Sequence, residues 1–173
     1  MPSPFWRALA ATVSIAGLVG CGAPAEPGVG LPLSAVQAYE SYDETWTLNY
    51  PVDWQMLPYE ARPAGSTFGA AGPDAEDLAV ATREWTAAPE PATLLDEARR
   101  AYGDRLREAE PALVQGRPGV RLVVDEPDTG VRALTYWVPR NGTLYALSLR
   151  ARAGAFAAKR GRLEAIAETF KLR

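Results

Sequence analysis

The chain has 173 residues, a hydrophobic fraction of 47% and a net charge of −3, which allows one domain with a sizeable core. It contains no histidine and one cysteine, which excludes Ser-His-Asp and Cys-His catalytic sites, an intramolecular disulfide and a multi-cysteine metal site. A clustered basic face, typical of nucleic-acid binding, is not evident. We therefore predict a protein that is not an enzyme, needs no cofactor and binds no nucleic acid.

Residues 1–20 have the organisation of a signal peptide. Arg7 supplies a positive start, and an uncharged, mostly apolar run over residues 8–19 has the length of the hydrophobic region of such a peptide. A bilayer-spanning helix needs about 20 apolar residues, so the run is short for that purpose. The alternatives are an ordinary secretory signal followed by a free cysteine, or an N-terminal anchor helix.

The apolar run ends in Leu-Val-Gly-Cys at residues 18–21, and this motif resembles the lipobox of bacterial lipoproteins. The resemblance implies that a signal peptidase cleaves between Gly20 and Cys21 and that the Cys21 thiol carries diacylglycerol. Two or three acyl chains anchor a protein stably. We expect the mature chain to be held by membrane lipid through Cys21 on the extracytoplasmic side of a bacterial membrane, in the cell envelope.

Residues 21–37 then form the lipidated cysteine and a flexible tether rich in Gly and Pro, and residues 38–173 form one globular domain. Alternating or apolar segments predict strands over residues 44–50, 54–57, 65–71 and 77–85. Helical spacing follows over residues 93–109, with Thr93 as the expected N-cap and Pro111 as the end of the segment.

Three more strands are predicted over residues 119–125, 131–139 and 143–152, and a closing helix over residues 154–172. Asn141-Gly142 is a strong signal for a type I′ hairpin turn. With this turn, Val138 faces Tyr145, and the further pairs on that apolar face are Tyr136 with Leu147 and Leu134 with Leu149. The prediction is an α+β fold: a mostly antiparallel β-sheet of about six strands flanked by helices on both faces.

The order of motifs along residues 40–172 resembles the PsbP-like domain family, an α/β/α sandwich. The motifs are Trp46 to Tyr50-Pro51-Val52-Asp53-Trp54, Phe68, Leu78 to Ala81, Thr93-Leu94-Leu95, Leu144-Tyr145-Ala146-Leu147 and Ile166-Ala167-Glu168-Thr169-Phe170. The resemblance implies an antiparallel sheet with helices on both faces and no known catalytic role. Some relatives bind zinc through histidine and acidic residues; without histidine, this property does not carry over.

Four early aromatics, Trp46, Tyr50, Trp54 and Trp85, are candidates for a partner or ligand surface. The alternative is that they belong to the core, as the resemblance implies for the Tyr-Pro-x-x-Trp residues. Carboxylates gather at Glu40, Asp43, Glu44, Asp74, Glu76 and Asp77, and we expect solvated surface and turn residues there. The last three could meet calcium but lack EF-hand spacing.

Basic residues Arg150, Arg152, Lys159, Arg160 and Arg162 could touch anionic headgroups, although a solvated helix face is the simpler interpretation. The leading hypothesis for function is a non-catalytic binding or assembly role with an envelope protein as partner. The alternative is a binder of lipid or a small apolar ligand, which predicts an enclosed apolar cavity of several hundred Å³. A hydrolase is the weakest candidate.

Overall fold

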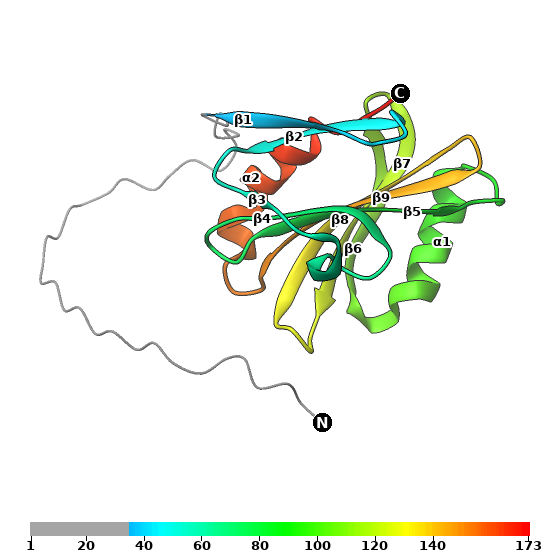
Figure 1. Ribbon diagram of the computed structural model, residues 1–173. Helices are drawn as coiled ribbons and strands as arrows, with labels where there is room; N and C mark the ends of the chain where they lie inside the picture. The colour runs from blue at the N-terminus through cyan, green and yellow to red at the C-terminus, as the bar shows by residue number, and fades with distance from the viewer. Residues whose placement is uncertain (1–34) are drawn as a thin grey trace, which may run out of the picture.

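The computed structural model describes residues 35–173 as two antiparallel sheets and two α-helices (Figure 1). The main sheet has seven strands in the order β3-β4-β5-β9-β8-β7-β6, and the small sheet has three in the order β1-β2-β10. The main-sheet strands are β3 (Gln55–Met56), β4 (Ser66–Ala71), β5 (Asp77–Glu84), β6 (Leu106–Val114), β7 (Arg117–Glu126), β8 (Val131–Arg140) and β9 (Thr143–Arg152). The small-sheet strands are β1 (Val36–Glu40), β2 (Trp46–Pro51) and β10 (Lys171–Leu172).

The helices lie on opposite faces of the main sheet. Helix α1 (Pro91–Tyr102) packs on β6 and β7, whereas α2 (Phe156–Ala167) packs on β8 and β9 and also contacts β2. Figure 1 shows α2 between the small sheet and the main sheet, and α1 on the far side. The predicted α+β class with helices on both faces is therefore confirmed. No helix among residues 35–173 has the length and apolar character to span a membrane.

Each face of the main sheet has its own hydrophobic core, because neighbouring residues of a strand point to opposite faces. Tyr136 packs against the core that contains α2, and the next residue, Trp137, belongs to the core that contains α1. Leu163 and Ile166 bury the inner side of α2, and Leu94 does the same for α1. The alternation along β7, β8 and β9 thus builds both cores at once.

The hairpin of β8 and β9 forms in the predicted register. Asn141 and Gly142 have φ of 49° and 76°, the positive values that a type I′ turn requires at both central positions. Val138 pairs with Tyr145, as predicted, and the pairs Tyr136 with Leu147 and Leu134 with Leu149 are also formed. The apolar pattern and the turn agree, and this agreement determines which side chains face each core.

The prediction of a helix over residues 93–109 is wrong in its extent. The helix begins at Pro91, which occupies the first helical position, where its missing N–H costs no hydrogen bond. It ends at Tyr102, because Gly103 has a positive φ of 51°. After the 3-10 helix η2 (Gly103–Arg105), residues 106–114 form β6, the edge strand of the main sheet. An edge position tolerates Pro111 inside a strand.

The closing helix is also shorter than predicted, since α2 ends at Ala167 and the chain turns into β10. The Thr169 hydroxyl explains this turn: its oxygen accepts a hydrogen bond from the Asn49 backbone N–H at 2.9 Å and lies 2.7 Å from the Ile166 carbonyl oxygen. The single hydroxyl hydrogen can be donated to the Ile166 carbonyl or to the Asn49 carbonyl 2.9 Å away, and the hydroxyl links the end of α2 to β2. With β1, β6 and β10 added to the seven strand segments read from the sequence, the described residues have ten strands, where a sheet of about six was expected.

Candidate functional site

The four aromatics predicted as a partner surface are core residues in this structure. Trp46, Tyr50, Trp54 and Trp85 are 2%, 5%, 1% and 9% exposed. The first three lie in the core that contains α2, and Trp85 lies in the core that contains α1. The structure therefore matches the alternative that they stabilise the fold. The other predicted site residues, Gly20 and Cys21, lie outside the described residues.

The acidic residues of the turn between β4 and β5 are engaged by cations of the same chain. Asp74 lies 2.9 Å from Lys159, and Glu76 lies 3.3 Å from Lys159 and 3.3 Å from Arg162. Asp77 lies 2.5 Å from Arg150. Within residues 35–173 no group of acidic residues converges as a metal site. Asp74 and Glu76 bind α2 to the sheet, and Asp77 links the neighbouring strands β5 and β9, so the arrangement of these carboxylates is structural.

The basic residues considered for headgroup contact are explained by the same network. Arg150, Lys159 and Arg162 are bound to the carboxylates just described, and Arg160 pairs with Glu108 and Glu164 at 3.0 Å each. Arg152 is the exposed member of the set. Four of the five cations thus hold elements together and do not form a free basic face.

A cleft of about 250 Å³ opens beside the turn that connects β1 and β2. We call it the turn cleft, and it is lined by Tyr39, Ser41, Tyr42, Asp43, Trp46, Thr67 and Thr82. Of its three aromatics, Trp46 is buried, Tyr39 is half-buried and Tyr42 is fully exposed. The cleft therefore combines a rigid aromatic floor with an aromatic side chain that extends into solvent.

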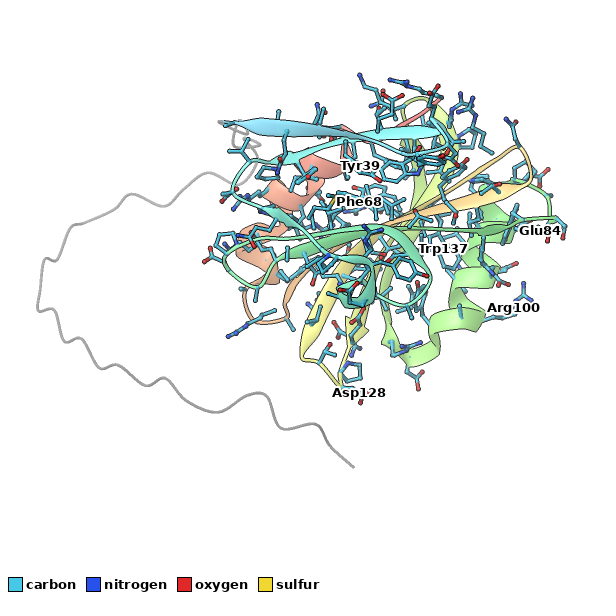
Figure 2. All side chains as sticks on the ribbon, in the orientation of Figure 1. Tyr39, Phe68, Glu84, Arg100, Asp128 and Trp137 are labelled. Carbon is cyan, nitrogen blue, oxygen red and sulfur yellow. The ribbon has the colours of Figure 1, made fainter. Side chains whose placement is uncertain are left out.

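The turn cleft exists because the small sheet stacks on the main sheet. Tyr39 points from β1 toward Phe68 on β4, with their ring centroids 4.1 Å apart (Figure 2). Trp46 packs beside them, 5.3 Å from the Tyr39 ring. Residues 39–46 supply one wall, while Thr67 and Thr82 reach the cleft from β4 and β5. Segments distant in sequence are thus brought together by the aromatic packing.

Hydrogen bonds hold the turn in one conformation. The Ser41 hydroxyl accepts from the Trp46 backbone N–H at 3.1 Å, and the Ser41 N–H donates to the Trp46 carbonyl at 3.0 Å. Glu44 has a φ of 57°, the left-handed conformation that lets the chain reverse. Asp43 and Tyr42 are consequently presented on a fixed loop.

The Asp43 carboxylate is held charged at the rim of the cleft. Its Oδ1 accepts hydrogen bonds from the Thr45 hydroxyl at 2.9 Å and the Thr45 N–H at 3.3 Å. The hydroxyl of Ser41, and then that of Thr45, stabilises the ionised form and holds the pKa of Asp43 below its usual value. No ion pair among residues 35–173 involves Asp43. The rim therefore offers an ordered negative charge that no described cation neutralises.

Two further clefts are present on the described part of the chain. One of about 220 Å³ lies on the α1 side of the main sheet, where Tyr102 and Arg105 meet the turn between β7 and β8. Its floor includes a hydrogen bond between the hydroxyls of Thr135 and Ser148 at 3.1 Å. The other, of about 290 Å³, lies between β6 and the end of α2 and includes exposed Leu113.

Sequence reasoning included Asp43 only among surface carboxylates and did not single out Tyr39 or Tyr42. The signal was present, since residues 39–43 read Tyr-Glu-Ser-Tyr-Asp, just before the aromatic strand that begins at Trp46. The local sequence pattern assigns no packing role to Tyr42, the tyrosine in the turn between β1 and β2. The missing information was which strands would face that turn.

Comparison with known proteins adds three solved structures of the same fold. Cyanobacterial PsbP from Synechocystis sp. PCC 6803 is 14% identical, with a TM-score of 0.57, over 88% of this chain and 99% of its own. LpqN of Mycobacterium tuberculosis, involved in cell envelope biogenesis, is 18% identical, with a TM-score of 0.54, over 79% and 91%. The Saccharomyces cerevisiae Ran-binding protein Mog1p is 14% identical, with a TM-score of 0.52, over 80% and 95%.

No protein-family model and no curated protein matches the sequence. The solved structures nevertheless show that the chain has the PsbP-like fold, an antiparallel sheet with helices on both faces, and this confirms the predicted fold resemblance. Identities of 14–18% establish the fold alone.

Proposed function

We propose that this chain is a membrane-anchored extracytoplasmic lipoprotein with a non-catalytic role, and that it binds a protein partner through the turn cleft. The observation that carries the binding role is the fully exposed Tyr42 beside a cleft floored by Tyr39 and Trp46. Tyrosine, tryptophan and arginine dominate the binding energy of protein interfaces, especially where a pocket lies at the centre of the contact. An exposed tyrosine on an ordered turn fits that role.

The known structures support a binding role in this fold. Mog1p is described as a Ran-binding protein and LpqN as a protein involved in cell envelope biogenesis. The fold is therefore used for binding in one case and in the envelope in another. The predicted lipid attachment at Cys21 agrees with an envelope location, and the tether would let the domain reach a partner away from the membrane surface.

The size of the turn cleft favours a protein partner there over the alternative of lipid or a small apolar ligand. Pockets that enclose drug-sized ligands have volumes of about 300–1,000 Å³ and mostly apolar walls. The three clefts described above have volumes of about 220, 250 and 290 Å³, and each carries polar side chains on its walls. Such clefts are of a size to receive one side chain of a partner.

Photo-crosslinking in intact cells of the native host tests the binding role. A photoreactive amino acid in place of Tyr42 is expected to form an adduct with one envelope protein, identified by mass spectrometry. The matched control carries the same amino acid at Arg100, which lies on the outer side of α1, away from the turn cleft (Figure 2). Identical adducts from both positions, or none from position 42, would contradict a docking site at the turn cleft.

Mass spectrometry of the protein from the same cells tests the anchoring. The expected mature chain begins at an acylated Cys21, and the variant Cys21→Ser is expected to keep residues 1–20 and to lose the acyl chains. An unacylated wild-type chain that begins at Met1 and fractionates with the cytosol would refute the lipoprotein assignment without affecting the crosslinking result.

A further inference from the structure

We propose that the turn cleft receives one arginine side chain of the protein partner, with the guanidinium stacked on the exposed tyrosine and paired with Asp43. This inference rests on the proposed binding function and specifies its chemistry. Four observations carry it: an aromatic surface, an unpaired carboxylate, hydroxyl acceptors on the inner wall and a volume suited to one side chain.

The chain itself shows how arginine is held by such groups. Arg83 lies over the rings of Trp85 and Trp137, with its guanidinium carbon 5.3 Å and 5.5 Å from the two centroids. The same guanidinium pairs with Glu97 at 3.4 Å. Aromatic faces attract a cation through their quadrupole, and a carboxylate on the other side completes the arrangement.

The turn cleft presents the same two kinds of group to solvent. Exposed Tyr42 and half-buried Tyr39 supply aromatic rings above the buried Trp46, and Asp43 supplies the carboxylate. No arginine or lysine of residues 35–173 lines this cleft. Arg173 lies at the same end of the domain but pairs with Glu40. The complementary cation is therefore expected from outside the described chain.

Aromatic rings combined with hydroxyl acceptors suit a guanidinium better than an ammonium. Thr67 donates its hydroxyl hydrogen to the Val80 carbonyl at 3.1 Å, so its oxygen presents lone pairs as an acceptor. Thr82 adds a second hydroxyl on the same wall. A guanidinium has five N–H donors in a plane and stacks on aromatic faces, whereas an ammonium is a compact charge that binds water strongly. A planar donor can satisfy Asp43 and a wall hydroxyl at the same time.

The test is a titration of the full processed chain, purified in detergent, with three blocked amino acids, followed by ¹H–¹⁵N correlation spectra. The probes are N-acetyl-arginine methylamide, its neutral isostere N-acetyl-citrulline methylamide, and N-acetyl-lysine methylamide. We expect millimolar binding of the arginine probe, with shifts concentrated at Tyr42 and the Trp46 indole. Its affinity should exceed that of the citrulline probe by at least about fivefold, because only the arginine probe can form the cation–π contact and the ion pair. The preference is expected to stay modest, because each contact is weak at an exposed site.

Two variants locate the effect. Asp43→Asn keeps an oxygen for the Thr45 hydrogen bonds and removes the charge, so the preference for the arginine probe over the citrulline probe should shrink to the part that the aromatic rings supply. Tyr42→Ala removes a fully exposed ring that no core contact depends on, and it should weaken arginine binding with the fold intact. Glu44→Gln is the matched control, because it removes the adjacent exposed carboxylate that does not line the cleft.

Equal affinities for arginine and citrulline, equal or tighter binding of lysine, or an arginine preference that Asp43→Asn leaves unchanged would each overturn the inference. A specific crosslink from position 42 together with any of these results would leave the binding role in place and refute only the arginine assignment. Arginine binding without a position-specific crosslink would refute the proposed protein partner instead.

Discussion

The buried carboxylate of Glu76 is predicted to hold α2 on the main sheet, and its removal should destabilise the domain strongly. Its side chain is 0% exposed, with Oε2 3.3 Å from Arg162 Nη1. Oε1 lies 3.3 Å from Lys159 Nζ, an ion-pair contact without hydrogen-bond geometry. The perturbation is Glu76→Ala, which leaves both cations on α2 without this partner.

The expected loss in the free energy of unfolding depends on the contacts that Lys159 and Arg162 keep in the variant. Removal of one partner of a buried ion pair costs about 3–5 kcal/mol, mainly because the other charge stays desolvated. Lys159 and Arg162 are 27% and 26% exposed and retain Asp74 and Asp53 as partners. These contacts reduce the penalty, so we expect a loss of about 3 kcal/mol, at the lower end of that range. This is a large share of the 5–15 kcal/mol by which domains are usually stable.

Urea unfolding at neutral pH measures this loss by linear extrapolation, with an unchanged slope expected for a cooperative transition. Asp74→Ala is the matched control, since Asp74 contacts the same Lys159 from an exposed position in the same turn, and exposed pairs contribute little. A loss of under about 1 kcal/mol for Glu76→Ala, or an equal loss for the control, would refute the reasoning.

Three further variants test the packing and the electrostatics. Gly119→Ala on β7 would place a Cβ 2.5 Å from the Trp137 carbonyl oxygen, so unfolding in urea should show a loss of about 1–3 kcal/mol; wild-type stability would contradict that geometry. The same substitution at Gly161, in the middle of α2 with open space around it, should raise stability by about 0.5–1 kcal/mol, and a loss there would show a hidden clash. Arg132, and then Arg107, holds the pKa of Asp125 at about 2. Because this folded-state pKa is depressed, the stabilisation is complete above the unfolded value of about 3.9 and is lost as pH falls through about 2. The stability gap between wild type and Asp125→Asn should close over that range in acid titrations followed by circular dichroism, and a gap that is unchanged at pH 2 would be inconsistent with these ion pairs.

The sequence was sufficient for the parts of the fold in which local and long-range preferences agree. Asn141-Gly142 and the alternation on either side of it determine the β8–β9 register, and the observed pairs are the predicted ones. The predicted end of the first helix was wrong because apolar residues continued at helical spacing beyond the point where α1 ends. Leu106 lies four residues after Tyr102, yet the positive φ at Gly103 redirects the chain into a strand. The site was harder still, because the turn cleft needs Thr67 and Thr82 from other strands.

Strands β8 and β9 each have ten residues and alternate between the two cores. We expect that neither core loses its order while the other stays intact, because the same backbone carries side chains of both. Amide hydrogens of α1 and of α2, which cover opposite faces of the main sheet, should therefore exchange through one common opening event. The β8–β9 hairpin therefore links the two cores, and we expect the two cores to unfold together.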